Sequence, residues 1–223
     1  MGPCFHRDDT LWIVGGSGLP YFCGMNLLAI DTAGPRLQLA LLRADSVDTL
    51  VEDMAQGQAE RIFPTIAELL QRNTRSYADL GRVAVTTGPG SFTGLRIGLS
   101  AARGLGLALG IPVAGIPTLT ALSLGTRCDL TAVLLDAKRG ESYVQIFSGP
   151  AIPVGDAAIL ATEEASRLIP AGAELITSPI VDIAALARFA ATADPSRFPP
   201  DATYVRGADA KPQDAARIPR VVA

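Results

Sequence analysis

Runs of apolar residues that end at glycine or proline give the first half of the chain a strand-and-turn pattern. Residues 27–30 form a continuous apolar run, and Gly34 and Pro35 turn the chain soon after it. Leucines then alternate with other residues over 37–41, which is typical of the return strand of a β-hairpin. The pattern predicts a hairpin here and a third strand near 49–52.

A helical period replaces the strand pattern after these runs. Apolar residues recur three and four apart over 58–73, which predicts an amphipathic helix. Pro64 lies within it and lacks a backbone N–H, so it should bend the helix unless the helix starts there. The residues that we place on its apolar face are Ala59, Ile62, Phe63, Ile66, Leu69 and Leu70.

The stretch 83–122 organises the rest of the chain. An apolar, β-branched run breaks at a glycine turn, helical spacing resumes at Leu95, and Pro112 ends that helix. A strand–helix–strand–helix order implies a parallel sheet. The predicted elements are strand 83–87, turn 88–90, helix 95–109, strand 113–116 and a second helix capped by Thr118.

The second half repeats the opening pattern. Residues 130–136 are an apolar run that ends at Asp136, a turn containing Gly140 follows, and 143–147 alternate as a return strand. Asp31 ends the corresponding run in the first half, so the pattern indicates a duplicated architecture. Beyond it we expect a helix over 162–168 capped by Thr162, a helix over 183–192 and an irregular tail from 193.

Composition bounds the class of protein. The 223 residues are 48% hydrophobic and 18% charged, enough to bury a core in one domain or two small ones. The net charge is −3 and no run of Lys or Arg occurs, which argues against autonomous binding to nucleic acid or a membrane surface. Residues 1–24 are apolar but broken by Gly and Pro, so we interpret them as an appendage or a mis-assigned start, with the domain beginning at Met25.

Few residues suited to metal binding or nucleophilic catalysis occur. Three cysteines lack zinc spacing and form no CxxC pair, which fits a reducing cytosol. The single histidine is His6, so no His cluster for a metal and no Ser/His or Cys/His arrangement occurs in the main body. We therefore expect neither a bound metal nor hydrolytic chemistry of these types.

Two segments could still hold an anion. An Asp at the end of an inner strand, followed by Thr, can hold a metal-phosphate, but it can equally cap its own turn, and these residues alone favour the cap. The glycine loop could offer backbone N–H groups to an anion, although it matches neither a Walker loop nor a dinucleotide fingerprint and can equally be a helix-capping turn. The candidate nucleotide or phosphate residues are Asp31, Thr32, Gly88, Gly90, Ser91, Thr93 and Asp136.

The helix 95–109 is unusually rich in glycine and alanine. Each glycine inside a helix costs about 1 kcal/mol relative to alanine, so close packing should offset the cost. The partner in that packing is either the protein's own sheet and neighbouring helix or another subunit, and the residues alone leave both open. Arg96 and Arg103, seven residues apart, would border such a contact.

Several motifs together resemble the TsaB (YeaZ) family of bacterial tRNA-modification proteins. They are LLAIDTA at 27–33, TTGPGSFTGLRIG at 86–98, IPTL at 116–119, DAKRGESYVQIF at 136–147 and YVR at 204–206. GPGSFTGLR is highly specific for the family. The resemblance covers 25 to about 206, strongly through 147 and weakly between 151 and 202.

The resemblance implies an actin-like α/β fold of the ASKHA class, a duplicated RNase H-like fold with two lobes. We expect a partner-binding lobe over 25–125 and a reduced lobe with an irregular tail over 126–223. It also implies a cytoplasmic, non-catalytic subunit in the formation of N6-threonylcarbamoyladenosine in tRNA. The subunit would bind and activate a TsaD-type transferase, with a TsaE-type ATPase joining them and tRNA approached only indirectly.

In that family the subunits meet through the first two helices of each partner, which here are 58–73 and 95–109. ATP and metal belong to the partner subunits, and we expect no cofactor on this chain. Two departures affect contact details: GQAE at 57–60 replaces a histidine-containing segment, and Lys138 replaces a common arginine. The expected interface residues are Ile62, Thr65, Leu69, Leu95, Gly98, Leu99, Ala102, Arg103 and Gly106.

Two other functions stay open at this point. One is a small ATPase or phosphotransferase of the same fold that uses Asp31 and Asp136 around a metal-nucleotide. The other is a homodimer, present when the chain is alone, whose small-residue helix face is covered by a second copy.

Overall fold

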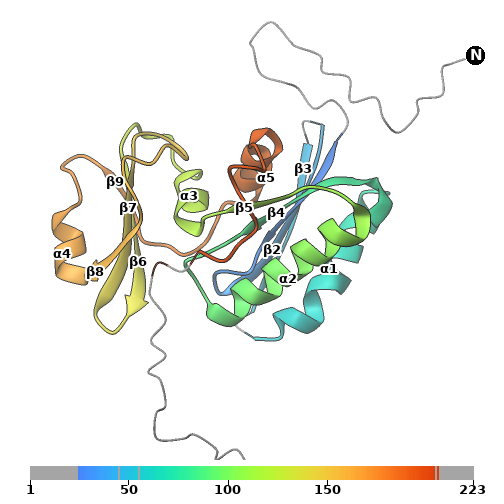
Figure 1. The fold of residues 1–223 in the computed structure, drawn as a ribbon, viewed down its shortest axis with the longest axis horizontal. Helices are drawn as coiled ribbons and strands as arrows, with labels where there is room; N and C mark the ends of the chain where they lie inside the picture. The colour runs from blue at the N-terminus through green and yellow to red at the C-terminus, as the bar shows by residue number, and fades with distance from the viewer. Residues whose placement is uncertain (1–24, 45, 55, 204, 206–223) are drawn as a thin grey trace, which may run out of the picture.

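Two β-sheets lie side by side, with helices between them and on their outer faces (Figure 1). The computed structural model describes residues 25–44, 46–54, 56–203 and 205. The predicted extension 1–24 and the YVR motif, apart from Val205, lie outside the described residues. No helix in the described ranges is both long and apolar enough to cross a membrane.

The first sheet has the strand order β3-β2-β1-β4-β5. The central strand β1 (Asn26–Asp31) pairs antiparallel with β2 (Arg36–Arg43), which pairs antiparallel with β3 (Ser46–Asp53). On its other side β1 pairs in parallel with β4 (Leu80–Thr86), and β4 with β5 (Val113–Ile116). The predicted hairpin, third strand and parallel pair are confirmed.

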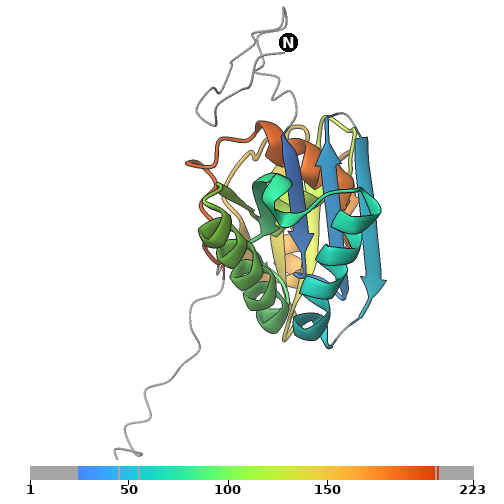
Figure 2. The same ribbon diagram turned by 90° about the vertical axis from the view of Figure 1, so that its right-hand side faces the viewer.

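Two helices cover the outer face of this sheet side by side, as Figure 2 shows. They are α1 (Gln58–Arg72) and α2 (Phe92–Leu109), and the short helix η1 (Tyr77–Asp79) precedes β4. The strands alternate between two cores: Leu28 and Ile30 face α1 and α2, whereas Leu27 and Ala29 face the second sheet. Strands β1, β2 and β4 are therefore buried on both faces, whereas the residues of the edge strand β3 are half-buried or exposed.

The second sheet has the order β8-β7-β6-β9. Strand β6 (Thr131–Lys138) pairs antiparallel with β7 (Glu141–Phe147) and in parallel with β9 (Glu174–Ile176). Strand β8 (Ala158–Ala161) and helix α4 (Thr162–Arg167) complete it. The sequence analysis did not find β8 or β9, which are four and three residues long.

The duplication is visible in the strand order, because β8-β7-β6-β9 repeats β3-β2-β1-β4 with the same antiparallel and parallel pairings. In each repeat a hairpin and a third strand precede a helix, and the next strand pairs in parallel with the first. The sheets, with their helices, form the duplicated α/β arrangement expected from the sequence.

The two repeats exchange one helix each. Helix α3 (Thr118–Ser123) follows the first sheet along the chain but packs on β6 and β7. Helix α5 (Ile183–Thr192), from the segment assigned to the second lobe, packs on all but the last strand of the first sheet. Both helices contribute to one core between the sheets, so each sheet is partly covered by the other's chain.

A buried arginine fixes the end of α5 to the first sheet. Arg82 of β4 is 5% exposed, and its Nη1 donates to the carbonyl oxygens of Ala190 at 2.8 Å and Ala193 at 2.9 Å. A cation at the carboxyl end of a helix also interacts favourably with the helix dipole. Desolvation lowers the pKa of Arg82 from its usual value, although an arginine stays protonated.

Two predicted helix caps are wrong in detail. Thr118 and Thr162 are the first helical residues, and the caps are Pro117 and Ala161, without side-chain hydrogen bonds. The threonine hydroxyls instead bind neighbouring loops, since that of Thr162 donates to the carbonyl oxygen of Gly140 at 3.1 Å.

Candidate functional site

Asp31 ends β1 and is completely buried. Its Oδ1 accepts hydrogen bonds from the Thr86 hydroxyl at 2.7 Å and from the Ala33 backbone N–H at 3.1 Å. Its Oδ2 accepts one from the Gln38 side-chain amide at 2.9 Å. Burial raises the pKa of Asp31, while these hydrogen bonds act in the opposite direction. The carboxylate therefore joins β1, β2 and β4, and the bond from Ala33 is the turn cap that the sequence favoured.

Several backbone N–H groups of the loop that precedes α2 bind acceptors within the protein. The N–H of Gly88, which has a φ of 108°, donates to Thr118 Oγ1 at 3.1 Å. The N–H of Ser91 donates to the carbonyl oxygen of Ala33 at 2.8 Å. The Ser91 hydroxyl oxygen accepts from the Gly94 N–H at 3.2 Å and so caps α2. The loop is thus a helix-capping turn, the structural alternative that the sequence left open.

The glycines of this loop allow it to approach the turn after β1. A Cβ atom at Gly90 would lie 2.6 Å from the carbonyl oxygen of Ala33, and one at Gly94 would overlap the carbonyl oxygen of Thr32. The Thr32 hydroxyl donates to the carbonyl oxygen of Gly94 at 2.7 Å. Close contact between the two turns therefore accounts for glycine at both positions.

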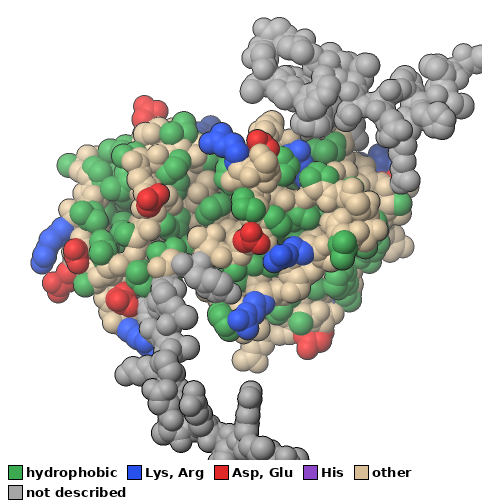
Figure 3. Space-filling view, in the orientation of Figure 1, with side chains coloured by type: hydrophobic (Ala, Val, Ile, Leu, Met, Phe, Trp, Pro, Cys, Tyr) green, Lys and Arg blue, Asp and Glu red, His purple; other side chains and the backbone are tan. Residues whose placement is uncertain are grey.

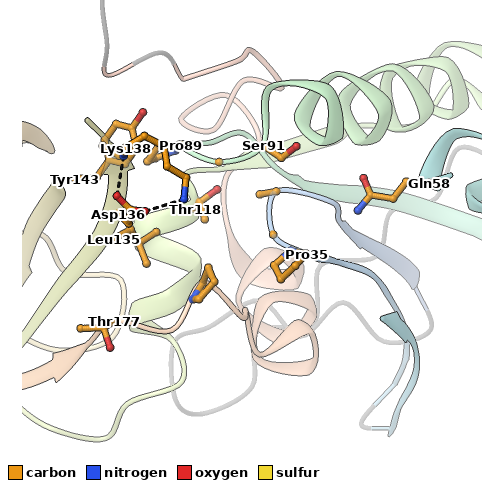
Figure 4. A pocket seen from close by; sticks show the side chains of 15 residues that line it. Pro35, Gln58, Pro89, Ser91, Thr118, Leu135, Asp136, Lys138, Tyr143 and Thr177 are labelled. Carbon is orange, nitrogen blue, oxygen red and sulfur yellow. Dashed lines mark hydrogen bonds and ion pairs between the residues drawn. The ribbon is translucent and has the colours of Figure 1, made fainter. Parts of the chain in front are cut away.

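A cleft of about 650 Å³ opens between the two sheets, where β1, β4 and β6 end (Figure 4). Of the candidate phosphate residues, Gly90, Ser91 and Asp136 line it, whereas Asp31, Thr32, Gly88 and Thr93 do not. The lining residues are Ala33, Gly34, Pro35, Gln58, Pro89, Gly90, Ser91, Thr118, Leu135, Asp136, Ala137, Lys138, Tyr143, Thr177 and Pro179. The structure therefore brings together only part of the predicted site.

Asp136 supplies the one carboxylate in this lining, and Lys138 is its partner. Its two oxygens accept from the Lys138 ammonium and from the Lys138 backbone N–H, each at 2.8 Å. The pair lowers the pKa of Asp136 and raises that of Lys138. Both side chains are well exposed, so the ion pair contributes little to stability.

The cleft offers a single carboxylate, that of Asp136, to a metal-nucleotide. Mg²⁺ is held by oxygen ligands, usually one or two carboxylates together with phosphates and water. Asp31 is enclosed and does not reach the cleft, and Asp136 forms an exposed ion pair with Lys138. Among the residues that the structure describes, no group of three or more His, Cys, Asp or Glu side chains could hold a metal ion.

The helix residues chosen for a partner contact point into the protein. Eight of the nine expected interface residues are buried, and Arg103 is the exposed one. A Cβ at Gly98 would overlap the Thr32 hydroxyl, one at Gly106 would overlap Val113, and Ala102 is fully buried. Packing on the protein's own sheet therefore accounts for these small residues. The buried residues are therefore not the ones that a partner would touch. Binding of a partner to α1 and α2 stays a prediction.

The outward side of the two helices carries an apolar groove of about 490 Å³, which we name the α1–α2 groove. Phe63 and Phe92 border it and are 46% and 57% exposed. The guanidinium of Arg96 lies 3.7 Å above the ring of Phe92, a cation–π contact. The residues that line the groove are Ala59, Ile62, Phe63, Phe92, Thr93, Arg96, Ile97, Ser100 and Ala101.

The exposure of the two phenylalanines of the groove was not predicted from the sequence. Phe63 was placed on the apolar face of the helix, but that face is complete with Ile62, Ile66 and Leu69, and Phe63 lies beside it. Phe92 is the first residue of α2 and projects from its exposed side. At 100° per residue Phe63 lies only about 20° from the buried Leu70, so helical spacing alone does not identify Phe63 as exposed.

Charged side chains do not gather at either site. On the face shown in Figure 3, basic and acidic side chains are interspersed, and the described residues form no continuous basic patch there. Arg103 of α2 has Asp201 as a partner at 3.7 Å. Recognition at the groove would therefore depend on apolar and aromatic contacts.

Comparison with known proteins gives a matching family model and several similar sequences. Residues 52–149 match the family model described as TsaD, tRNA N6-adenosine threonylcarbamoyltransferase. The tRNA threonylcarbamoyladenosine biosynthesis protein TsaB of Escherichia coli is 37% identical over 123 residues, 53% of either chain. The protein of that name from Bacillus subtilis is 34% identical over 126 residues, 55% of either chain. The matches thus span about half the length of these curated relatives.

The fold matches a solved structure over most of the chain. YeaZ from Pseudomonas aeruginosa superimposes with a TM-score of 0.67, covering 81% of this chain and 99% of that one. The two sequences are 22% identical, so this likeness is one of fold. The expected actin-like, RNase H-like α/β class is confirmed.

Proposed function

Because the chain belongs to the TsaB (YeaZ) family, we propose that it helps to form N6-threonylcarbamoyladenosine in tRNA, as a non-catalytic scaffold and activator. A TsaD-type paralogue performs the transfer, this chain binds it in the cytoplasm, and a TsaE-type ATPase joins the pair. The observation that carries the proposal is the α1–α2 groove, an exposed aromatic surface on two long helices.

The groove has the composition of a protein-binding surface. Aromatic residues and arginine are enriched among the side chains that dominate binding energy, and Phe63, Phe92 and Arg96 supply both kinds here. Helices commonly bind partners by packing apolar side chains into such a groove. We therefore place the paralogue's helices against α1 and α2.

The cleft supports a non-catalytic role for this chain. A phosphotransferase of this fold would need carboxylates free to hold a metal, whereas Asp31 is enclosed by three hydrogen bonds and Asp136 is paired with Lys138. The cleft lies where strands end, so ATPase activity at this position is the alternative function to test. ATP turnover by the purified chain, lost in Asp136→Ala, would replace the scaffold proposal.

A charge placed in the groove tests the contact. Phe92→Asp should weaken binding to the paralogue by at least about 30-fold, because an aromatic side chain that anchors an interface contributes about 2 kcal/mol or more. The matched control is Ile152→Asp, since Ile152 lies after β7, away from the groove, and is also 57% exposed. Binding is measured by calorimetry, with circular dichroism to confirm that both variants fold.

Function is measured in a strain depleted of its own copy of the protein. Wild-type and Ile152→Asp chains should restore the modified nucleoside in tRNA, and Phe92→Asp should not. Unchanged binding by Phe92→Asp would place the contact elsewhere. A homodimer that the paralogue fails to dissociate would favour self-association as the role of the groove.

A further inference from the structure

The chain that follows α5 returns along the edge of the first sheet. We name residues 198–203 the C-terminal strap. The N–H of Gly115 in β5 donates to the carbonyl oxygen of Phe198 at 2.8 Å, and the N–H of Thr203 donates to that of Thr87 at 2.8 Å. The hydroxyl oxygens of Thr87 and Thr203 lie 3.0 Å apart. The strap is thus tied to the sheet at both ends.

The strap passes from one core to the other around this edge. Phe198 packs against the core between the sheets, and its ring meets that of Phe189 edge-on at 5.7 Å. Ala202 packs against the core beneath α1 and α2. A segment with one side chain in each core closes the edge next to β5, a four-residue strand with a sheet neighbour on one side only.

The strap also reaches α2, beside which Figure 2 shows it in red. Asp201 pairs with Arg103 of the helix at 3.7 Å. At Gly88, an added Cβ would lie 3.0 Å from both Leu95 of α2 and the carbonyl oxygen of Thr203. The strap and the first turns of α2 therefore pack against the same loop.

We propose that the strap is a latch that holds α2 in position, and that packing of the strap against the first sheet is coupled to binding at the α1–α2 groove. The coupling rests on the proposed function, whereas the latch concerns this chain alone. When the strap leaves, Gly115 and Thr87 lose their backbone partners, Ala202 leaves the core, and the side of α2 is uncovered. Because coupling is reciprocal, a partner bound in the groove also stabilises the seated strap.

Thr203→Pro tests the latch by removing one backbone donor. The variant cannot make the bond to Thr87, and cooperative release should speed hydrogen exchange at the Gly115 amide and along α2. Affinity for the paralogue should fall by about 5- to 150-fold, the range typical of coupled sites. The matched control Thr203→Ala keeps the N–H and loses only the hydroxyl contact with Thr87, so exchange and affinity should change far less than in Thr203→Pro.

Gly115→Ala displaces the strap from its other end. The added methyl would overlap the carbonyl oxygen of Pro199 in the strap, and it would also lie 2.6 Å from the side chain of Thr87, which contacts the strap. The strap should therefore leave while the residues of the groove stay unchanged. Thermal melting identifies whether the variant is folded, and its affinity should fall as that of Thr203→Pro does. In the wild type, adding the paralogue should slow exchange of the Gly115 amide.

The outcomes separate this inference from the proposed function. If wild type does not bind the paralogue, the proposed function is wrong, and the latch is still judged by α2 exchange in Thr203→Pro. Unchanged α2 exchange in that variant would overturn the latch. Fast Gly115 exchange together with wild-type affinity would overturn the coupling.

Discussion

The two sheets share a topology but differ in how completely they are covered. The first sheet has α1 and α2 on its outer face and α5 on its inner face. The second has α3 on its inner face, and outside it the six-residue helix α4. Leu175 of β9 is 47% exposed, whereas the leucines of β1 and β2 are buried. Duplication of a strand order therefore does not imply equal burial.

This difference assigns separate roles to the repeats. The first repeat supplies a sheet whose strands β1, β2 and β4 are buried on both faces, and the long helices that carry the α1–α2 groove. The second repeat supplies α5, which covers the inner face of the first sheet, and the strap at its edge. The second repeat thus mainly stabilises the first.

The largest effect should come from the doubly covered sheet. Leu39 of β2 is fully buried in the core under α1 and α2. Leu39→Ala should lower the free energy of unfolding by about 2–5 kcal/mol, because it removes a buried side chain and leaves a cavity. Urea denaturation measures the loss, and a cost below about 1 kcal/mol would contradict the comparison.

The next effect concerns the link between the repeats. Arg82→Met removes the donors that bind the last carbonyls of α5, and hydrogen bonds to charged groups contribute about 1.5–3 kcal/mol. Stability should fall by that amount. The control is Arg188→Met on the exposed side of α5, which should change stability by less than about 0.5 kcal/mol. Equal losses would mean that Arg82 does not hold the helix.

The contributions of Asp31 and Asp136 to stability should change with pH in opposite directions. The pKa of Asp31 is raised by burial, so its contribution to stability is present below the ordinary pKa and is lost as pH rises through the folded value. The pKa of Asp136 is lowered by Lys138, so its contribution is present above the ordinary pKa and is lost as pH falls through the folded value.

Asp31→Asn tests the first half of this statement. In this variant the new side-chain amide faces the side-chain amide of Gln38, and both groups are donors. The lost hydrogen bond should lower the free energy of unfolding by roughly 1–3 kcal/mol at every pH. Because the variant cannot ionise, its deficit should shrink as pH rises above 4. Urea unfolding between about pH 2 and 8 measures this. For Asp136→Asn the deficit should shrink as pH falls below the ordinary pKa of 3.8, which is the opposite trend. A deficit for Asp31→Asn that grows with pH would contradict the assigned direction.

The smallest effect should come from the sparsely covered sheet. Leu175→Ala should change the free energy of unfolding by at most about 0.5 kcal/mol, because the side chain is half exposed on a three-residue edge strand. The same urea titration as for Leu39→Ala measures it. A loss above 2 kcal/mol would show that β9 belongs to a core as important as that of the first sheet.

The sequence predicted the elements whose side chains repeat with a clear period. Strands β1, β2 and β4 are continuous or alternating apolar runs, and α5 has the predicted bounds. Strands β8 and β9 were missed because four and three residues are too few to show alternation, and β9 begins with Glu174. Their pairing depends on the sheet that receives them.

The contacts between elements were harder to predict than the elements themselves. Small residues on α2 indicated close packing, but nothing in their spacing identifies the sheet as the partner, so Gly98 and Gly106 were assigned to another subunit. Asp31 was a candidate phosphate ligand because the sequence does not show that its carboxylate is enclosed. Thr86 and Gln38, which enclose it, come close to Asp31 only in the folded chain. Sequence motifs identified the family, whereas the exposed surface required the structure.

The exchange of α3 and α5 has a consequence for cutting the chain. Fragments 25–125 and 126–205 each contain one whole sheet, yet each also contains a helix whose apolar side belongs on the other. Expressed alone, both fragments would present uncovered apolar surface and aggregate. Expressed together, they should reassemble without a covalent link, which makes the segment around residue 125 a natural site for a split-protein reporter.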